Sequence, residues 1–118
     1  MAEVPKAILW IRGGPRDGET VPLADGDIVL GREPTNDLMV DEMCVSRRHA
    51  RIRGLSGGYW IEDLGSLNST YVNGNKVESE GTKLLDNDRI ELGGVDTQIH
   101  LVFRELEATL DGGSPPPG

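Results

Sequence analysis

The sequence has little of what disulfide-bonded, secreted and membrane proteins depend on. A single cysteine among 118 residues cannot form an internal disulfide, which favours a protein of a reducing compartment. No apolar run approaches the roughly 18 residues that a membrane-spanning helix needs. The start of the chain has no basic segment followed by an apolar one, so we expect no secretory signal. These absences predict a cytoplasmic protein without a membrane anchor.

Basic charge is also scarce, and so are aromatic side chains. Lys and Arg number 12 against 20 Asp and Glu, which gives a formal net charge of −8. An acidic chain repels nucleic acid and anionic lipid over long distances. Two Trp, two Tyr and one Phe leave few aromatic platforms on which bases of a single strand stack. We therefore predict neither a nucleic acid nor a membrane as a partner.

What the chain does contain is glycine, at 16 positions, and short apolar runs that alternate with polar residues. Alternation broken by turn residues indicates strands rather than helices. About ten short strands at such intervals predict an all-β sandwich or barrel. The one segment that favours a helical half-turn is 105–110. The strands are expected over residues 7–11, 20–23, 28–30, 38–40, 48–53, 59–64, 71–72, 76–77, 88–92 and 98–103.

The length and the composition of the two ends indicate one domain. A chain of 118 residues is close to the usual size of a single domain, roughly 100–150 residues. We expect the folded domain over residues 7–106, after a short N-terminal extension of residues 1–6. Residues 107–118 are rich in Pro and Gly, have nothing to bury and indicate a linker that leads to further domains of a longer protein.

Residues for catalysis or metal binding do not come together in this sequence. Cys44 and His49 are close enough to form a nucleophile–base pair, but a small, half-buried Cys44 is the favoured interpretation. His49 and His100 stand far apart without partners at metal-ligand spacing. The acidic turn at residues 86–88 lacks the Gly and the closing Glu of a calcium loop. We predict no enzyme activity, no metal and no cofactor.

One segment is basic although the chain is acidic. Residues 46–53 carry four of the 12 basic residues, with no acidic residue among them. Alternation predicts a strand here, with His49, Arg51 and Arg53 on the solvent side. Ser46 and Arg47 precede the alternating run and are expected in a loop. A hydroxyl beside a guanidinium can bind a phosphate, because an arginine fork matches two phosphate oxygens.

Two further segments combine with this one to form a familiar pattern. A glycine and an arginine end an early strand, and a polar loop with an asparagine leads into a hairpin. The order Gly31-Arg32, then Ser46-x-x-His49, then residues 68–74 (Asn-Ser-Thr-Tyr-Val-Asn-Gly), resembles the forkhead-associated (FHA) domain of the bacterial type. The resemblance covers about residues 7–106. It implies an eleven-stranded β-sandwich of two antiparallel sheets, whose loops at one end bind phosphothreonine in a partner protein, downstream of a Ser/Thr protein kinase.

The resemblance also implies roles for single residues in phosphopeptide binding. Arg32 would pair with the phosphate, Ser46 would donate a hydrogen bond to it, and Arg47 would add a second cationic contact. Asn68 would hold the peptide backbone. Leu67 departs from the family, because many members have Ser or Thr there with a hydroxyl that reaches the phosphate. Either one contact is missing, or Ser66 or Ser69 replaces it. Ser69 itself stands where Gly is common.

Other matching positions have structural roles in the family. Gly31 and His49 would support the loops, and Asn73-Gly74 would form the hairpin turn. The predicted function is a phosphothreonine-peptide binding module in kinase signalling. Two alternatives stay open: a phospho-independent interaction or dimerisation domain, and a regulatory module of a larger enzyme or transcription regulator.

Overall fold

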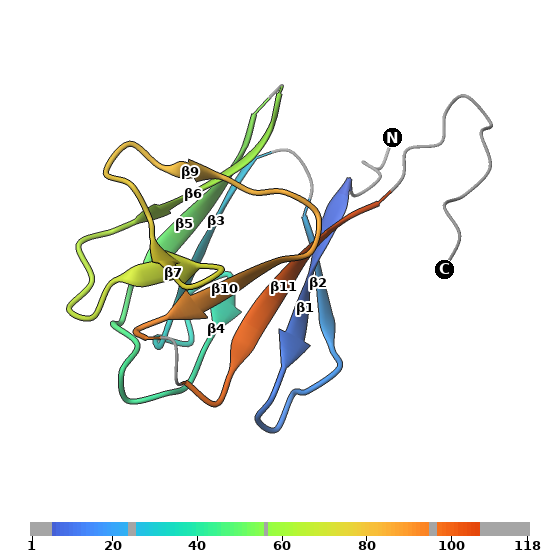
Figure 1. The fold of residues 1–118 in the computed structure, drawn as a ribbon. Helices are drawn as coiled ribbons and strands as arrows, with labels where there is room; N and C mark the ends of the chain where they lie inside the picture. Colours follow the sequence, from blue (N-terminus) through green and yellow to red (C-terminus); the bar gives the residue numbers. More distant parts are fainter. Residues whose placement is uncertain (1–5, 24–25, 56, 95–96, 107–118) are drawn as a thin grey trace.

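The computed structural model describes residues 6–23, 26–55, 57–94 and 97–106, and these residues form eleven strands in two packed sheets (Figure 1). The described residues include no helix that is long and apolar enough to cross a membrane. The strands are β1 (Ala7–Arg12), β2 (Thr20–Leu23), β3 (Gly26–Gly31), β4 (Leu38–Met39), β5 (Ala50–Leu55), β6 (Gly58–Asp63), β7 (Thr70–Val72), β8 (Asn75–Lys76), β9 (Thr82–Lys83), β10 (Asp88–Leu92) and β11 (His100–Glu105).

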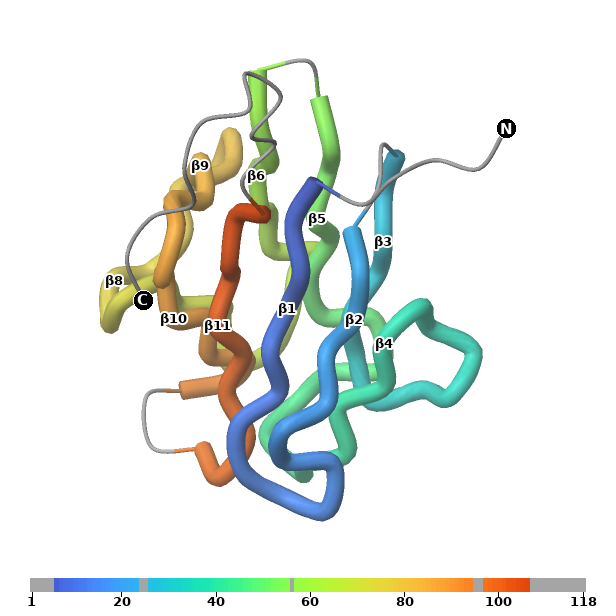
Figure 2. The backbone as a smooth tube through the Cα atoms, turned by 90° about the vertical axis from the view of Figure 1, so that its right-hand side faces the viewer, coloured from blue at the N-terminus to red at the C-terminus, as the bar shows by residue number. Residues whose placement is uncertain are grey.

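The two sheets have six and five strands, in the orders β2-β1-β11-β10-β7-β8 and β4-β3-β5-β6-β9. Figure 2 shows β1, β2 and β11 side by side, with β5 and β6 behind them. The expected β-sandwich of eleven strands is confirmed, with one correction. The sheets are not antiparallel throughout, because β3 and β4 pair in parallel after the chain crosses over through residues 32–37.

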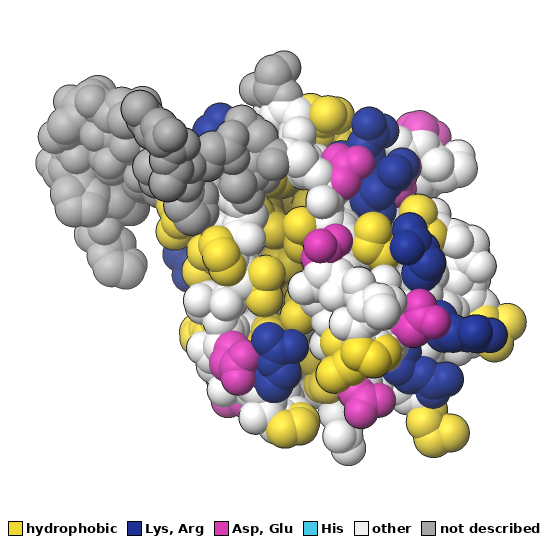
Figure 3. All heavy atoms as spheres, turned by 180° about the vertical axis from the view of Figure 1, so that it is seen from behind, with side chains coloured by type: hydrophobic (Ala, Val, Ile, Leu, Met, Phe, Trp, Pro, Cys, Tyr) yellow, Lys and Arg dark blue, Asp and Glu magenta, His cyan; other side chains and the backbone are white. Residues whose placement is uncertain are grey.

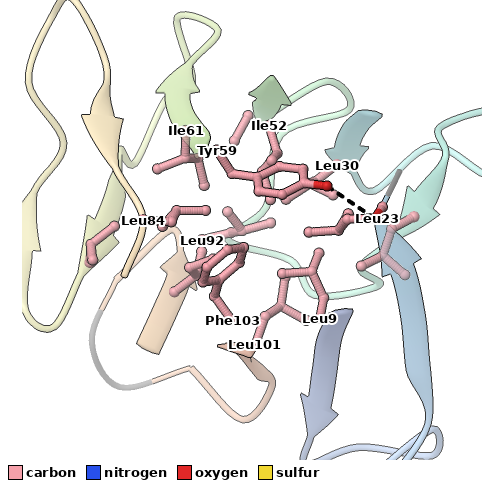
Figure 4. Packing of buried hydrophobic residues seen from close by; sticks show 14 of the residues in the cluster. Leu9, Leu23, Leu30, Ile52, Tyr59, Ile61, Leu84, Leu92, Leu101 and Phe103 are labelled. Carbon is pink, nitrogen blue, oxygen red and sulfur yellow. Dashed lines mark hydrogen bonds between the residues drawn. The ribbon is translucent and has the colours of Figure 1, made fainter. Parts of the chain in front are cut away.

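Side chains that alternate along the strands fill the space between the sheets. β1 is buried at every second residue, and β11 supplies Leu101 and Phe103 to the same core. Figure 4 shows these residues against Tyr59 and Ile61 from the opposite sheet. The Tyr59 hydroxyl donates a hydrogen bond to the Leu23 carbonyl over 3.1 Å, so its one polar group is satisfied. Each large apolar side chain buried here stabilises the fold by about 1.5–3 kcal/mol.

One strand was not predicted, and some predicted segments begin or end at other residues in the structure. β9 was not predicted, because two residues carry no detectable alternation. β11 begins at His100 rather than at residue 98, since the Gln98 and Ile99 amides donate to the Glu42 carboxylate over 3.1 and 3.3 Å. Glu105 ends a strand rather than beginning a helical half-turn, and residues 107–110 of that prediction lie outside the described residues.

The acidic segment 86–88 is a tight turn, as expected. Asn87 has a φ of 75°, and the Asp88 carboxylate accepts the Leu85 amide over 2.8 Å. The Asn73-Gly74 turn joins β7 to β8 with φ values of 53° and 83°, which is the left-handed pair that a two-residue hairpin turn needs.

Candidate functional site

Three loops meet at one end of the sandwich, at the lower left in Figure 1. They join β3 to β4, β4 to β5 and β6 to β7. The Arg32 amide donates to the Ser46 carbonyl over 2.9 Å, and the Leu67 amide donates to the Ser46 hydroxyl oxygen over 3.1 Å. Ser46 therefore contacts both neighbouring loops through its own backbone and side chain.

Gly31 allows the first two loops to approach each other closely. A Cβ atom at this position would lie 2.2 Å from the Arg47 carbonyl oxygen and 2.8 Å from its carbon. Only a residue without a side chain fits there. The same Arg47 carbonyl accepts the Glu33 amide over 3.2 Å and the Asn36 side-chain amide over 2.6 Å. Gly31 thus holds the backbone of Arg32 against that of Ser46 and Arg47.

His49 is fully buried behind these loops. Its Nδ1 accepts the Ser46 amide over 3.0 Å, so Nδ1 carries no proton, and Nε2 donates to the Ser69 carbonyl over 2.7 Å. These two bonds fit the supporting role that the resemblance implied for His49, whereas the face that alternation assigns to it, shared with Arg51 and Arg53, was wrong. The chain bends at residues 47–48 and β5 starts only at Ala50, so the imidazole turns inward to these two backbone partners.

Ser46 and Asn68 keep specific atoms available for a ligand. The Ser46 oxygen accepts the Leu67 amide, which leaves the hydroxyl proton to donate outward. The Asn68 side-chain NH2 donates to the Cys44 carbonyl over 3.0 Å. That bond orients the amide group of Asn68 and leaves its carbonyl oxygen to accept a hydrogen bond from a bound backbone.

Asp63, which sequence reasoning missed, organises the third loop. Its carboxylate accepts hydrogen bonds from the Gly65 and Ser66 amides over 3.0 and 2.9 Å, and from the Ser66 and Thr70 hydroxyls over 2.5 and 2.7 Å. Partial burial raises the pKa of Asp63, but the hydrogen bonds from Ser66 and Thr70 outweigh it and lower the pKa below its usual value. The spacing Asp-x-Gly-Ser, typical of a side-chain-capped turn, was the available signal.

The hydrogen bonds of the β6–β7 loop determine which polar groups of Ser66 and Ser69 are already engaged. The Ser66 hydroxyl donates to Asp63 and accepts the Ser69 amide over 2.8 Å, so both of its functions are engaged within the loop. Ser69 has a φ of 71°, which L side chains adopt at a cost. Its carbonyl accepts both the His49 ring and the Gly93 amide, while its hydroxyl makes no hydrogen bond to a described residue.

The arginines of this end differ from the other arginines of the chain. All nine arginines of the sequence are described, and six of them form ion pairs with carboxylates. Within the described ranges, Arg32, Arg47 and Arg48 have no carboxylate partner, and all three are exposed. In Figure 3 basic side chains gather along one side of the rear face, and acidic side chains lie beside several of them. The three unpaired arginines all lie at the loop end.

Several of the nearby acidic groups are engaged with backbone amides or within their own loop. Glu42 binds two backbone amides before β11, and the Asp37 carboxylate accepts the Val29 amide over 2.8 Å. Asp63 is held inside its own loop. The three arginines without a carboxylate partner among the described residues therefore all come from the β3–β4 and β4–β5 loops. Exposed guanidinium groups in this arrangement suit a compact anion such as a phosphate.

The structure does not assemble the conceivable Cys–His pair. Cys44 is half-buried beside the core, and its thiol is 3.7 Å from the Leu92 carbonyl oxygen. Burial raises the pKa of Cys44, and the charge of Glu42 raises it further, so the thiol stays protonated and weakly nucleophilic at neutral pH. Both ring nitrogens of His49 are bonded to backbone atoms. The described part of the chain contains no cluster of three or more metal-ligating side chains.

Comparisons with known proteins agree with the fold and the loop pattern. The FHA domain family model matches residues 28–93, which include all three loops. The chain is 36% identical over 108 residues to the glycogen accumulation regulator GarA of Mycolicibacterium smegmatis, covering 92% of this chain and 65% of that protein. It is 39% identical over 98 residues to the oxoglutarate dehydrogenase inhibitor of Corynebacterium jeikeium, covering 82% and 63%. The chain thus spans less than two thirds of either relative.

Solved FHA domain structures resemble the fold of this chain. An FHA domain from a study of phosphothreonine-dependent FHA domain interactions superposes with a TM-score of 0.74 at 30% identity, over 86% of this chain and 97% of that one. The FHA domain of FhaA, solved in complex with the intracellular domain of Rv3910, superposes with a TM-score of 0.71 at 30% identity, over 83% and 99%.

Proposed function

Because the chain belongs to the FHA domain family, we propose that it binds phosphothreonine-containing segments of partner proteins at its three-loop end. The carrying observation is the group of exposed arginines, Arg32, Arg47 and Arg48, that lack carboxylate partners among the described residues. A phosphorylated side chain has a charge of about −1.5 to −2 at neutral pH and three acceptor oxygens. It supplies the counter-charge that these arginines lack within the chain.

Each site residue contributes a different interaction. The Arg32 guanidinium pairs with the phosphate, and the Ser46 hydroxyl donates a hydrogen bond to it. Arg47 adds a second cationic contact from the same loop. The free carbonyl oxygen of Asn68 accepts a backbone amide of the peptide. His49 fixes Ser46 against Ser69 from within, so the donors are oriented before the ligand arrives and less ordering is needed on binding.

We infer that the chain acts by binding and not by catalysis. The two histidines and the cysteine are not arranged as a nucleophile and base, and both of the named relatives are regulators, of glycogen accumulation and of oxoglutarate dehydrogenase. A regulatory role for this chain, through a partner phosphorylated by a Ser/Thr kinase, follows from the same proposal. The proposal includes a cytoplasmic location, because such kinases act in the cytoplasm.

Calorimetric titration with the phosphothreonine, phosphoserine and unmodified versions of one peptide tests the proposal. The phosphothreonine form is expected to bind at least tenfold more tightly than the unmodified form, since each charge-assisted contact contributes about 1.5–3 kcal/mol. Arg32→Ala removes most of this difference. Arg104→Gln is the matched control, because Arg104 lies on the far half of β11, away from the loops, where its exposed pair with Asp86 contributes little.

Two outcomes contradict the proposal. One is equal affinity for the phosphothreonine, phosphoserine and unmodified peptides. The other is an Arg32→Ala variant that binds like the parent. The phospho-independent alternative makes the opposite forecast, since it requires partner binding to survive phosphatase treatment.

A further inference from the structure

An apolar cavity lies near the edge of the sandwich where β4 ends the five-stranded sheet. In Figure 2, β1 and β2 face the viewer and β4 lies to their right. The cavity has a volume of about 150 Å³, and its apolar walls are formed by Ile11, Leu38, Met39, Val40, Ile99 and Leu101. None of the residues proposed to bind phosphothreonine lines it. Much of its wall comes from β1, the β1–β2 loop and the start of β11, which are not among the three loops.

We propose that this cavity takes one apolar side chain, of about the size of Leu, Met or Phe, from a basic segment of a partner protein. The contact needs no phosphate and uses another part of the surface, so it goes beyond the proposed function and does not depend on it. It gives the chain a second place at which a partner is held.

The walls of the cavity are held by bonds within the chain. The Gly13 amide donates to the Asp17 carboxylate over 2.7 Å, and a Cβ atom at Gly13 would lie 2.0 Å from the Gln98 carbonyl oxygen. The Glu42 carboxylate accepts the Gln98 and Ile99 amides over 3.1 and 3.3 Å, which ties the β4–β5 loop to the start of β11. Because the chain makes these contacts by itself, binding requires little further ordering of the walls.

The volume limits the occupant to about one side chain. An apolar cavity of about 150 Å³ accommodates a benzene ring, whereas sites for drug-sized ligands have about 300–1,000 Å³. Met39 is partly exposed between the buried Leu38 and Val40, and an unbranched thioether adjusts to apolar groups of different shape. A group of this size binds weakly alone, so it gains affinity as part of a larger partner.

The charges around the cavity favour a cation beside the apolar group. Arg16 and Asp41 are the charged residues that line the cavity, and Arg16 pairs with Glu19 over 2.9 Å. Asp41 is exposed and has no cationic partner among the described residues. The neighbouring Glu42 carboxylate, which binds backbone amides, adds a second negative charge. A Lys or Arg next to the apolar side chain supplies the missing counter-charge, and the net charge of −8 favours the approach of a basic segment.

Short peptides without phosphate test the proposal. The probes are Ala-Lys-Phe-Lys-Ala, Ala-Lys-Ala-Lys-Ala and Ala-Gln-Phe-Gln-Ala with blocked ends, and NMR follows the methyl groups of Ile11, Leu38 and Ile99 during titration. We expect the Lys-flanked Phe peptide to bind at least about tenfold more tightly than the Ala peptide, since it buries one large apolar side chain. We expect it to bind about two- to fivefold more tightly than the Gln-flanked peptide, the range of an exposed charge pair.

Matched variants locate the binding. Ile99→Phe fills the cavity and is expected to reduce the affinity of the Phe peptide to that of the Ala peptide. Ile28→Phe is its control, because Ile28 is also partly buried against the core but does not line the cavity. Met39→Trp adds bulk from the exposed side and replaces Ile99→Phe if thermal melts show that variant unfolded. Asp41→Asn removes the preference for Lys flanks, whereas Glu105→Gln, at the exposed far end of β11, leaves it unchanged.

Three outcomes overturn the proposal. One is equal affinity for the Phe and Ala peptides, and another is binding of the Phe peptide that persists in the folded filling variant. The third is benzylammonium that binds as tightly as the Phe peptide, because the occupant is then a free small cation and not a side chain of a partner.

The proposed function is judged separately. The probes contain no phosphate, and Arg32→Ala is expected to leave their affinities unchanged. If Arg32→Ala abolishes their binding, the peptides occupy the three-loop end and the cavity proposal fails. If phosphothreonine peptides show no selective binding while the Phe peptide enters the cavity, only the proposed function fails.

Discussion

Replacing Gly31 by alanine perturbs the site through sterics alone. The φ of Gly31 lies outside the left-handed region, so alanine suits the backbone conformation at this position. The added Cβ would lie 2.2 Å from the Arg47 carbonyl oxygen and 2.7 Å from the Asn36 side-chain nitrogen. A carbon and an oxygen need at least about 3 Å, so the two loops must separate by about 1 Å. The hydrogen bond from the Arg32 amide to the Ser46 carbonyl, 2.9 Å long, spans that gap.

The cost of this separation can be worked out from the contacts it breaks. Forcing a methyl group into a packed contact costs about 1–3 kcal/mol. The Arg32–Ser46 and Glu33–Arg47 backbone bonds contribute about 0.5–1.5 kcal/mol each. We expect Gly31→Ala to lose about 2–6 kcal/mol of unfolding free energy, a large part of the total stability of a typical domain. Because Arg32 and Ser46 move apart, phosphopeptide affinity is expected to fall by at least about tenfold.

Chemical denaturation and calorimetric titration measure the two effects. Gly57→Ala is the matched control, because its φ also lies outside the left-handed region and its Cβ would meet nothing closer than a Trp60 ring carbon at 3.6 Å. Gly57 lies beside the β5–β6 turn, at the opposite end in Figure 1. A Gly31→Ala variant with the stability and the affinity of the parent would refute the reasoning.

Three other substitutions test the loop that follows β6. Leu67→Thr restores the hydroxyl common in the family, and we expect calorimetry to show several-fold tighter phosphopeptide binding; unchanged or weaker binding contradicts this. Asp63→Asn removes acceptors of the loop amides and is expected to cost about 1–3 kcal/mol at neutral pH by denaturant unfolding. Since the pKa of Asp63 is lowered in the folded state, the carboxylate stabilises the protein fully above its usual value near 3.8 and loses this effect as the pH falls through the folded value. The parent should therefore lose more stability than the variant in acid, and parallel pH profiles would disprove it. Ser69→Gly relieves a φ of 71° and is expected to raise thermal stability by up to about 1 kcal/mol; a lower Tm argues against strain at this residue.

The sequence predicted the architecture because alternation and turn residues are local signals. The burial of β1 at every second residue and the left-handed turn at Asn73-Gly74 are both readable from neighbouring residues. β9 was missed because two residues are too few to show a period. The parallel pairing of β4 with β3 was missed because pairing direction depends on how the chain crosses over, which no local pattern specifies.

The residues of the candidate site could be proposed from the sequence, but the geometry that brings them together could not. Arg32, Ser46, Arg47, Asn68 and Ser69 stay predictions as phosphopeptide-binding residues, and the structure brings their loops together through the bonds of Ser46 and Asn68. Alternation alone would assign His49 to the solvent side, whereas the family resemblance implied a role in supporting the loops, which agrees with its hydrogen bonds to the Ser46 amide and the Ser69 carbonyl. The roles of Asp63 and Asn36 were not predicted. Asn36 bonds to Arg47, which is distant in the sequence, and Asp63 stands in a segment whose composition is that of an ordinary turn.

The most direct test of the account is to map phosphothreonine-peptide binding residue by residue. Amide resonances of the isotopically labelled protein are followed by NMR during titration with the phosphorylated peptide and with its unmodified form. The account predicts that shifts specific to the phosphorylated peptide are concentrated at Arg32, at residues 46–48 and at residues 67–69. Shifts centred on another face of the sandwich, or the same shifts with the unmodified peptide, would contradict it.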